Sequence, residues 1–339
     1  MKETKAVLWG LGAMGSGIYK LITERAGIKI TGAIGRNPQK FGQDLGESAG
    51  MKPCGVKISG DAAAVLAAAE ADIVLHATGS FFKEVHPELL QAVRAGCNVI
   101  TIAEEMAEPW SADYALAADL DKAAKEKGVT VIGTGINPGF VLDALIIALT
   151  GVCFNIKKIE AERVNDLSPF GHTVMSTQGV GTTPDQFARG VEEGKIVGHI
   201  GFTQSISLIA RALGWELDRI VEEKDPIISS TSRQTPVVKV EPGMVAGCYH
   251  RAYGYRNGEI AISLKHPQQI RPEAEGVETG DYIRIEGTPM VNLSIKPEIP
   301  GGIGTIAMAV NMIPLVLAGS PGLKTLVDLP APASWSKLR

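Results

Sequence analysis

Cysteine is scarce in this sequence, with four residues in a chain of 339. The four lie far apart, no C-x-x-C pair occurs, and no cysteine–histidine set has the spacing of a zinc motif. This pattern predicts neither a disulfide framework nor a structural zinc site, and it is typical of a reducing compartment. We therefore expect a cytoplasmic protein without a structural metal. The residues are Cys54, Cys97, Cys153 and Cys248.

An excess of positive charge is also missing, since the formal net charge is −4 at pH 7. This balance offers no electrostatic footprint for nucleic acid or for an anionic membrane surface. The two longest apolar runs, 140–154 and 303–318, are too short for a membrane span, and each is interrupted by a polar residue. Charged residues lead straight into the first predicted strand, so we expect no signal peptide.

Glycine is plentiful, with 39 residues, and its most informative cluster directly follows an apolar run at 6–9. Three glycines there have the spacing G-x-G-x-x-G, and residues 17–25 carry apolar side chains at helical spacing. In a strand–turn–helix unit such glycines permit a sharp turn, a close approach to a pyrophosphate and tight packing of helix on strand. The stretch therefore predicts a dinucleotide site. Its predicted binding residues are Gly10, Gly12, Ala13, Met14 and Gly15.

The second predicted strand, 28–34, lacks at its end the acidic residue that often holds the ribose hydroxyls of NAD. Gly35, Arg36 and Asn37 stand there instead. No carboxylate at this point would repel a 2′-phosphate, and an arginine could hold that phosphate bidentately. We therefore expect NADP to be accepted and slightly favoured, with dual use of NAD and NADP possible. A solvated loop arginine is the alternative interpretation.

Two further strand ends carry candidate site residues, because ligands of open parallel sheets lie beyond the carboxyl ends of the strands. The strand at 72–76 ends in the small residues Ala77, Thr78 and Gly79, which should line the cofactor cleft. The strand at 98–102 ends in two adjacent carboxylates, at positions 104 and 105. Because adjacent side chains diverge, one of them can face the cleft while the other finds a partner elsewhere.

The fold class follows from how these elements alternate. Residues 1–135 alternate strands and helices, which predicts a parallel sheet covered on both faces. From residue 157 onward strand-like runs dominate, which predicts a largely antiparallel sheet with helices on one face. The predicted helices are 17–25, 62–71, 87–95, 111–127, 185–193, 202–213 and 304–318. The predicted strands of the second half are 157–164, 236–240, 250–256, 259–265, 281–286 and 291–296.

We therefore predict an α/β protein with a Rossmann-type doubly wound parallel sheet and a second α+β domain. The 45% content of hydrophobic residues is ample for two cores. The first domain should comprise 1–138 and be completed by the helical segment 303–330. The second should comprise 139–302 and serve substrate binding. A domain boundary near Asn137 would leave the active cleft between the domains.

Several motifs of the chain are similar to those of 2,4-diaminopentanoate dehydrogenases. They are the opening G-L-G-A-M-G, I-T-I-A-E-E-M at 100–106, G-I-N-P-G-F at 135–140, E-R-V-N-D at 162–166 and the closing G-G-I-G-T with V-N-M-I-P and P-G-L. These enzymes belong with native amine dehydrogenases in a wider dihydrodipicolinate-reductase-like group. The resemblance covers nearly the whole chain.

The resemblance implies oxidative deamination of the C4 amine of 2,4-diaminopentanoate to 2-amino-4-oxopentanoate. Ammonia would be released and NAD(P)+ reduced, as in amino-acid fermentation of the ornithine type, and the reverse reaction would aminate small ketones. It also implies a homodimer formed through the second domain.

Glu104 matches the catalytic glutamate of that family. Amine oxidation needs a base that takes the ammonium proton and then activates water, and a carboxylate at the cofactor-facing end of a strand can do both. A carboxylate that only serves a helix dipole is the alternative. Glu105 is the second candidate for the base.

The amino-acid end of such a substrate needs a cationic group for its carboxylate. On a strand, Arg163 and Asn165 share one face, and arginine can grip a carboxylate bidentately while asparagine adds a donor. His266, expected at the end of strand 259–265, matches a family position that approaches the same carboxylate. The second amine would need an acceptor, and Asn137 and Asp166 are both candidates.

Other functions fit the residues less well. The chain has no adjacent histidines of the kind that dihydrodipicolinate reductases carry, and neither Cys97 nor Cys153 has a convincing base partner for acyl chemistry. A related NAD(P)H reductase of another small substrate is one alternative. A non-catalytic NADP-binding sensor is another, although it would have no reason to gather Glu104, Arg163, Asn165 and His266 around one cavity.

Overall fold

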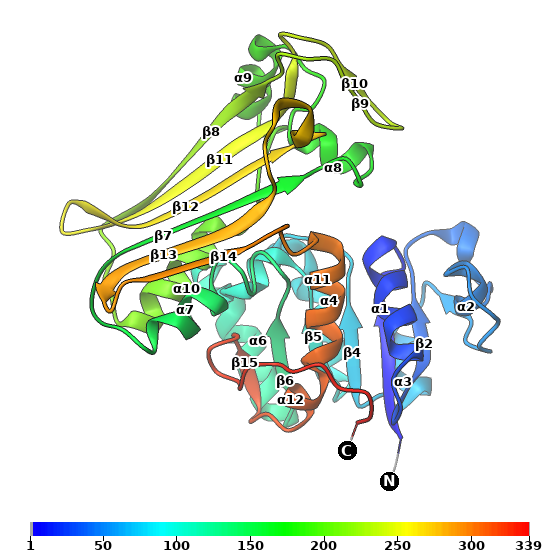
Figure 1. Ribbon diagram of the computed structural model, residues 1–339. Helices are drawn as coiled ribbons and strands as arrows, with labels where there is room; N and C mark the ends of the chain where they lie inside the picture. Colours follow the sequence, from blue (N-terminus) through cyan, green and yellow to red (C-terminus); the bar gives the residue numbers. More distant parts are fainter. Residues whose placement is uncertain (1–2, 339) are drawn as a thin grey trace. The chain divides into compact units, whose positions relative to one another are not determined.

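The computed structural model describes residues 3–338. The chain divides into two compact units, of which unit 1 comprises Met1–Phe140 with Gly301–Arg339 and unit 2 comprises Val141–Pro300. Unit 1 is therefore built from both ends of the chain. Figure 1 shows this in the red strand β15 (Gly322–Lys324), which lies beside β6 (Thr130–Gly133) and pairs with it in parallel.

Unit 1 is built on a parallel sheet of seven strands in the order β15-β6-β5-β4-β1-β2-β3. Its strands are short runs of Val, Ile, Leu and Ala that are buried on both faces, as in parallel sheets generally. The order reverses at β1, so the neighbours β2 and β4 lie on either side of the strand that leads into the glycine turn. The remaining bounds are β1 (Thr4–Trp9), β2 (Ile28–Ile34), β3 (Ile58–Ser59), β4 (Ile73–His76) and β5 (Asn98–Thr101).

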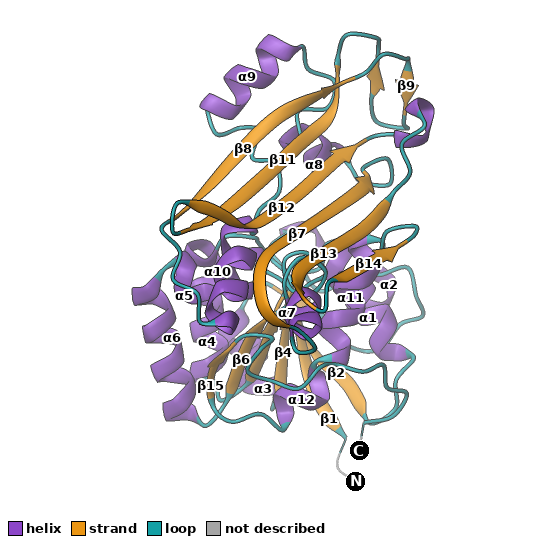
Figure 2. Ribbon diagram, turned by 60° about the vertical axis from the view of Figure 1, so that its left-hand side comes forward, coloured by secondary structure: helices purple, strands orange, loops and turns teal. Residues whose placement is uncertain are grey.

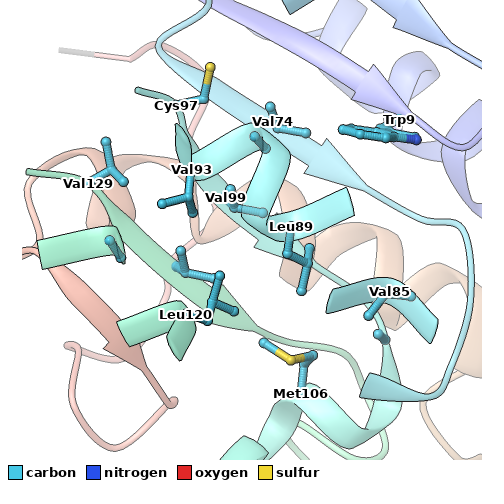
Figure 3. Packing of buried hydrophobic residues seen from close by; sticks show 14 of the residues in the cluster. Trp9, Val74, Val85, Leu89, Val93, Cys97, Val99, Met106, Leu120 and Val129 are labelled. Atoms are coloured by element: carbon cyan, nitrogen blue, oxygen red, sulfur yellow. The ribbon is translucent and has the colours of Figure 1, made fainter. Parts of the chain in front are cut away.

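Helices cover both faces of this sheet. On one face α3, α4 and α6 pack against the strands, and on the other lie α1, α11 and α12, of which α1 and α11 contact each other. Figure 3 shows the first of these cores, in which Leu89 and Leu120 of the helices meet Val74 and Val99 of the sheet. Burying such a side chain contributes about 1.5–3 kcal/mol. The bounds are α1 (Ala13–Thr23), α2 (Leu45–Ser48), α3 (Ala62–Ala69), α4 (Phe82–Arg94), α5 (Pro109–Ala112), α6 (Tyr114–Lys127), α11 (Gly301–Asn311) and α12 (Ile313–Leu317).

Unit 2 contains a six-stranded sheet in the order β14-β13-β7-β12-β11-β8. Its strands lie side by side in Figure 2, and their pairs are antiparallel except for β12 with β7, which are parallel. The bounds are β7 (Phe154–Asp166), β8 (Arg219–Ile228), β11 (Val245–Arg256), β12 (Glu259–Gln269), β13 (Gly280–Thr288) and β14 (Val291–Ile295), with β9 (Arg233–Gln234) and β10 (Lys239–Val240) forming a separate small hairpin sheet.

One face of the unit 2 sheet is covered by helix α10 (Phe202–Leu213), which packs on β8, β11 and β12. The helix buries Phe202, Ile206 and Ile209 at helical spacing and ends at Gly214, whose φ of 65° suits a left-handed cap. Because side chains alternate along a strand, every second residue of β8, β11 and β12 points to the face that α10 covers. The other helices of the unit are α7 (Ala144–Thr150), α8 (His172–Thr177) and α9 (Pro184–Glu192).

The predicted fold class is confirmed: the first sheet is parallel and doubly wound, and the second is largely antiparallel. Some predicted bounds were wrong. The helix expected at 87–95 begins at Phe82 and contains Pro87, because the carboxylate of Glu105 accepts a hydrogen bond from the Phe82 N–H and so caps an earlier start. The strand β8 was missed, since its charged sequence shows little apolar alternation.

Candidate active site

The carboxyl ends of the central strands of unit 1 lie along one edge of the sheet. Trp9 at the end of β1 is in register with Ile34 of β2 and with His76 of β4, and His76 is in register with Thr101 of β5. The loops that follow these strands therefore begin side by side. These loops, together with the helix starts that directly follow them, carry every predicted cofactor-binding residue and the two candidate carboxylates.

The glycines of the first loop fit a dinucleotide. Gly10 has a φ of 102°, and a Cβ at this position would overlap the carbonyl oxygen of Ala77. A Cβ at Gly15 would overlap the carbonyl oxygen of Gly10, whereas a Cβ at Gly12 would meet nothing within 4 Å. Open space at the middle glycine is what a pyrophosphate needs. No side chain caps the N-terminus of α1 at Gly12, so its N–H groups are available to an anion.

Ala13 and Met14 form the first turn of α1 behind this open space. At the end of β2, Gly35 is closely packed, because a Cβ there would press on Leu11 and Ile58. Asn37 uses its side-chain oxygen to accept the Gln39 N–H at 3.0 Å, which caps a short 3-10 turn. Asn37 therefore shapes this loop.

Arg36 is 62% exposed and pairs with Glu88 of α4, its Nη2 lying 2.7 Å from Oε1. After β4, Ala77 donates its N–H to the Trp9 carbonyl, and the Thr78 hydroxyl donates to Oε2 of Glu88 at 2.6 Å. Gly79 follows directly. The structure thus brings the loops after β1, β2 and β4 together along one edge, and Glu88 links two of them.

The two adjacent carboxylates after β5 have different surroundings. They open the 3-10 helix η2 (Glu104–Ala107). Glu105 accepts the Phe82 N–H on Oε2 at 2.6 Å, and its own N–H donates to the Ser80 carbonyl. Burial raises the pKa of Glu104, against the opposing effects of hydrogen bonds from its own backbone and the Ser80 side chain. Glu105 is thus engaged at a helix N-terminus, while Glu104 has the raised pKa expected of a proton-transfer group.

Arg163 of β7 is 2% exposed and forms an ion pair within unit 2. Its Nη1 donates to Oδ1 of Asp281 at 2.5 Å, and its Nη2 donates to the carbonyl of Ile299. Oδ2 of Asp281 in turn accepts the Ile299 N–H at 2.9 Å. These bonds close a ring that ties β7 to β13 and to the segment after β14. The guanidinium is therefore held in place.

Asn165 and His266 are buried on the same face of the unit 2 sheet as Arg163. Among the described residues, 3–338, no hydrogen-bond partner meets Oδ1 of Asn165. The ring of His266 packs edge-on against His199, with centroids 5.0 Å apart. Burial, reinforced by His199 and Arg163, lowers the pKa of His266 well below its ordinary value. His266 is therefore neutral near pH 7 and can donate one hydrogen bond without adding a charge.

His266 does not lie at a strand end as predicted. Strand β12 continues through Pro267 to Gln269, because Tyr249 and Gly247 of β11 keep the antiparallel pairing on one side. The prediction stopped early because proline cannot donate to a ladder and usually marks a strand edge.

The two candidates for the second amine differ in their surroundings. Oδ1 of Asp166 accepts the Ser168 N–H at 2.8 Å and the Arg271 N–H at 3.2 Å, so this oxygen closes a turn. Asn137 belongs to unit 1, is half-buried and lies in the loop after β6. In that loop the Ile136 N–H donates to Thr305 of α11.

Sequence reasoning missed Glu88, His199 and Asp281. Each acts through a partner far along the chain: Asp281 through Arg163, Glu88 through Arg36, and His199 through the ring of His266. No local motif marks any of them. Within residues 3–338 no cluster of metal-ligating side chains is found. Across the same residues, none of the helices has the length and apolar character that a membrane span needs.

A carboxyl group whose pKa is raised by burial, on the sheet edge that carries the glycine turn, suits a dehydrogenase, since the cofactor accepts a hydride while the protein handles the proton. The fold and this edge together define an NAD(P)-dependent oxidoreductase that acts on a small molecule.

Comparison with known proteins gives the particular family. Residues 140–338 match the family described as "2,4-diaminopentanoate dehydrogenase C-terminal domain", and residues 4–101 match "Dihydrodipicolinate reductase, N-terminus". The chain is 44% identical to 2,4-diaminopentanoate dehydrogenase of Acetoanaerobium sticklandii, with 98% of this chain and 95% of that protein covered. It belongs to the 2,4-diaminopentanoate dehydrogenase family.

Two amine dehydrogenases are also similar over nearly their full lengths. One, from Streptomyces virginiae, is 26% identical, with 96% of this chain and 95% of that protein covered. The other is the solved structure of an amine dehydrogenase from Mycobacterium smegmatis, which is 28% identical with a TM-score of 0.88 and covers 99% of this chain and 98% of that one. The predicted resemblance is confirmed.

Proposed function

We propose that this chain catalyses the NAD(P)+-dependent oxidative deamination of 2,4-diaminopentanoate to 2-amino-4-oxopentanoate and ammonia. In reverse it would aminate small ketones. The observation that carries the proposal is the 44% identity to a 2,4-diaminopentanoate dehydrogenase over 98% of the chain. The local chemistry supports it, because a carboxyl group with a raised pKa follows β5 on the nucleotide-binding edge.

Glu104 is the proposed base. A bound NAD(P)+ supplies the acceptor for the hydride that leaves C4 of the substrate. Glu104, as carboxylate, takes a proton from the C4 ammonium, which leaves the free amine whose lone pair assists hydride departure. After hydride transfer Glu104 releases that proton to solvent, and as carboxylate it takes a proton from the water that attacks the C4 iminium. It gives this proton to the nitrogen of the resulting carbinolamine, and it takes the proton of the carbinol hydroxyl as the C–N bond breaks and ammonia leaves. Burial and the Ser80 hydrogen bond keep its carboxylate in one place for these transfers.

Arg163, Asn165 and His266 are the proposed ligands of the amino-acid end. The guanidinium of Arg163 would bind the substrate carboxylate through its positive charge and its N–H donors, and neutral His266 would add one more donor. The Asn165 amide has both a donor and an acceptor, and its Oδ1 has no partner among the described residues. It can therefore donate to the carboxylate and accept from the C2 ammonium. Asn137 is kept as a further candidate for that ammonium.

We also propose a cytoplasmic homodimer. The four cysteines are free, as a reducing compartment permits.

A groove of about 400 Å³ on the outer face of the unit 2 sheet is lined by side chains of both signs, including Glu160, Glu162, Lys265 and Arg284. A twofold interface pairs a surface with itself, so mixed charges suit it. Light scattering of the purified protein measures the assembly directly.

The decisive experiment follows NAD(P)H absorbance while a panel of amines is offered with each nucleotide. The panel comprises 2,4-diaminopentanoate, alkyl amines without a carboxylate, and α-amino acids without a C4 amine. We expect 2,4-diaminopentanoate to have the highest kcat/KM. Turnover of simple alkyl amines alone would make the chain a general amine dehydrogenase. Nucleotide binding without turnover of any amine would contradict the proposal and favour a sensor.

The loss of kcat/KM at acid pH should reflect protonation of Glu104. Because burial raises the pKa of Glu104 above its ordinary 4.5, kcat/KM should fall with decreasing pH at a midpoint above 4.5. The sign follows from the role of the group: below its pKa Glu104 is protonated and cannot accept the ammonium proton. A limb at or below pH 4.5 would argue against Glu104 as the base.

A second prediction concerns Arg36 and the nucleotide. Arg36→Ala should raise KM for NADP+ by about tenfold and KM for NAD+ by much less, because only NADP+ carries the 2′-phosphate that the guanidinium can bind. The Arg36 side chain is 62% exposed, so its removal should leave the fold intact. Equal changes for both nucleotides would mean that the arginine is only solvated.

A further inference from the structure

Arg36 lies at one end of a chain of hydrogen bonds that links the carboxyl ends of β2, β4 and β5. Its Nη2 donates to Oε1 of Glu88 at 2.7 Å. The other oxygen of Glu88, Oε2, lies 2.8 Å from Nε2 of His76 and accepts the Thr78 hydroxyl at 2.6 Å. Nδ1 of His76 lies 2.9 Å from the Thr101 hydroxyl. Each oxygen of the Glu88 carboxylate thus has separate partners, Arg36 on one side and the buried strand ends on the other.

Glu88 is held in place by hydrogen bonds other than the one to Arg36, because His76 and Thr78 contact its second oxygen. The ionised carboxylate of Glu88 can only accept, so the contact with Nε2 of His76 places the ring proton on that nitrogen, and the Thr101 hydroxyl then donates to Nδ1. Burial lowers the pKa of His76, which favours the neutral ring.

Glu88 is ionised at neutral pH. Burial by itself would raise its pKa, but hydrogen bonds from His76, Thr78 and Arg36 outweigh burial and lower it to about 2. The side chain of Glu88 is 18% exposed, whereas that of Arg36 is 62% exposed. A largely covered, ionised carboxylate therefore holds an exposed guanidinium at the end of β2.

We propose that Glu88 is a nucleotide-selectivity residue, which occupies the fork of Arg36 and so reduces the preference for NADP over NAD. The inference rests on the proposed use of both nucleotides. Many NAD-binding sheets have an acidic residue at the end of the second strand, where this chain has Arg36. Here the carboxylate beside that position is Glu88, which comes from α4 and pairs with Arg36. A 2′-phosphate must compete with Glu88 for the guanidinium, whereas the 2′-hydroxyl of NAD needs no cation.

The test is a calorimetric titration of the whole protein with NADP+ and with NAD+, in the absence of substrate. Glu88→Gln keeps the shape of the side chain and removes its charge. We expect the ratio Kd(NAD+)/Kd(NADP+) to rise about two- to fivefold, the range of a partly exposed ion pair. Glu126→Gln on the exposed end of α6 removes the same charge far from this chain of hydrogen bonds, and it should leave the ratio unchanged.

The double variant Glu88→Gln/Arg36→Ala separates a role through Arg36 from simple repulsion of the phosphate. If Glu88 acts by holding Arg36, Glu88→Gln should no longer change the ratio once Arg36 is alanine. An undiminished change in that background, or no change in the single variant, overturns the proposal.

A second variant covers the case in which Glu88→Gln does not fold. Glu88→Asp keeps the charge near His76 and withdraws it from Arg36, so the ratio should again rise, and a constant ratio overturns the proposal. Wild-type protein that binds neither nucleotide would instead contradict the proposed function itself, which is a distinct result.

Discussion

Glu104→Gln should lower kcat for amine oxidation by about 10²–10⁴-fold, the contribution of a positioned general base. The amide keeps the size of the side chain and a hydrogen-bond acceptor for Ser80, but it cannot take a proton. Nucleotide affinity should change little, because the glycine turn and the loops after β2 and β4 are untouched. Steady-state kinetics with 2,4-diaminopentanoate and calorimetric titration of the nucleotide measure the two properties separately.

Glu105→Gln is the matched control for this experiment. A glutamine there still offers an oxygen to the Phe82 N–H, which Glu105 now meets at 2.6 Å, so α4 keeps its cap. Its kcat should remain within a few-fold of wild type. If Glu105→Gln loses activity while Glu104→Gln retains it, the base is Glu105 and the assignment made from burial is wrong.

The contrast between these neighbours shows where sequence reasoning reaches its limit. The glycine turn could be predicted because its requirements are local: a positive φ at Gly10, space at Gly12 and close packing at Gly15 all arise within one strand–turn–helix unit. The sequence identified the pair of carboxylates for the same reason, since a strand end is a local feature. Which of the two is engaged depends on Phe82, a partner in another helix, and the sequence does not show that contact.

The same reasoning applies to the arginines. Position and residue type identify Arg36 and Arg163 as candidate anion ligands, but the carboxylates that hold them come from α4 and β13. Neither carboxylate lies in a recognisable motif. The sequence therefore predicts which groups can bind an anion, whereas how strongly each is already engaged depends on tertiary contacts.

Arg163→Ala should lower the free energy of unfolding by about 3–5 kcal/mol, because it leaves the carboxylate of Asp281 buried without its partner. Arg163 and Asp281 are 2% and 1% exposed, so water cannot replace the guanidinium. The measurement is chemical denaturation at neutral pH. Arg189→Ala is the control in the same unit: Arg189 is exposed on α9, and its loss should cost no more than about 0.5 kcal/mol.

The pH dependence of the decrease in unfolding free energy shows its cause. It distinguishes an unpaired buried charge on Asp281 from a simple loss of side-chain packing. Burial raises the pKa of Asp281 even beside Arg163. Without the arginine that pKa rises further, so in the variant the protonated form becomes accessible as the pH falls. The deficit relative to wild type should therefore shrink towards acid pH, where wild type also begins to lose its ion pair. A deficit that is constant with pH would assign the effect to the lost side-chain volume. Unchanged stability with a raised KM for 2,4-diaminopentanoate would make Arg163 purely a substrate ligand, since a group that serves only the ligand contributes nothing to the unliganded fold.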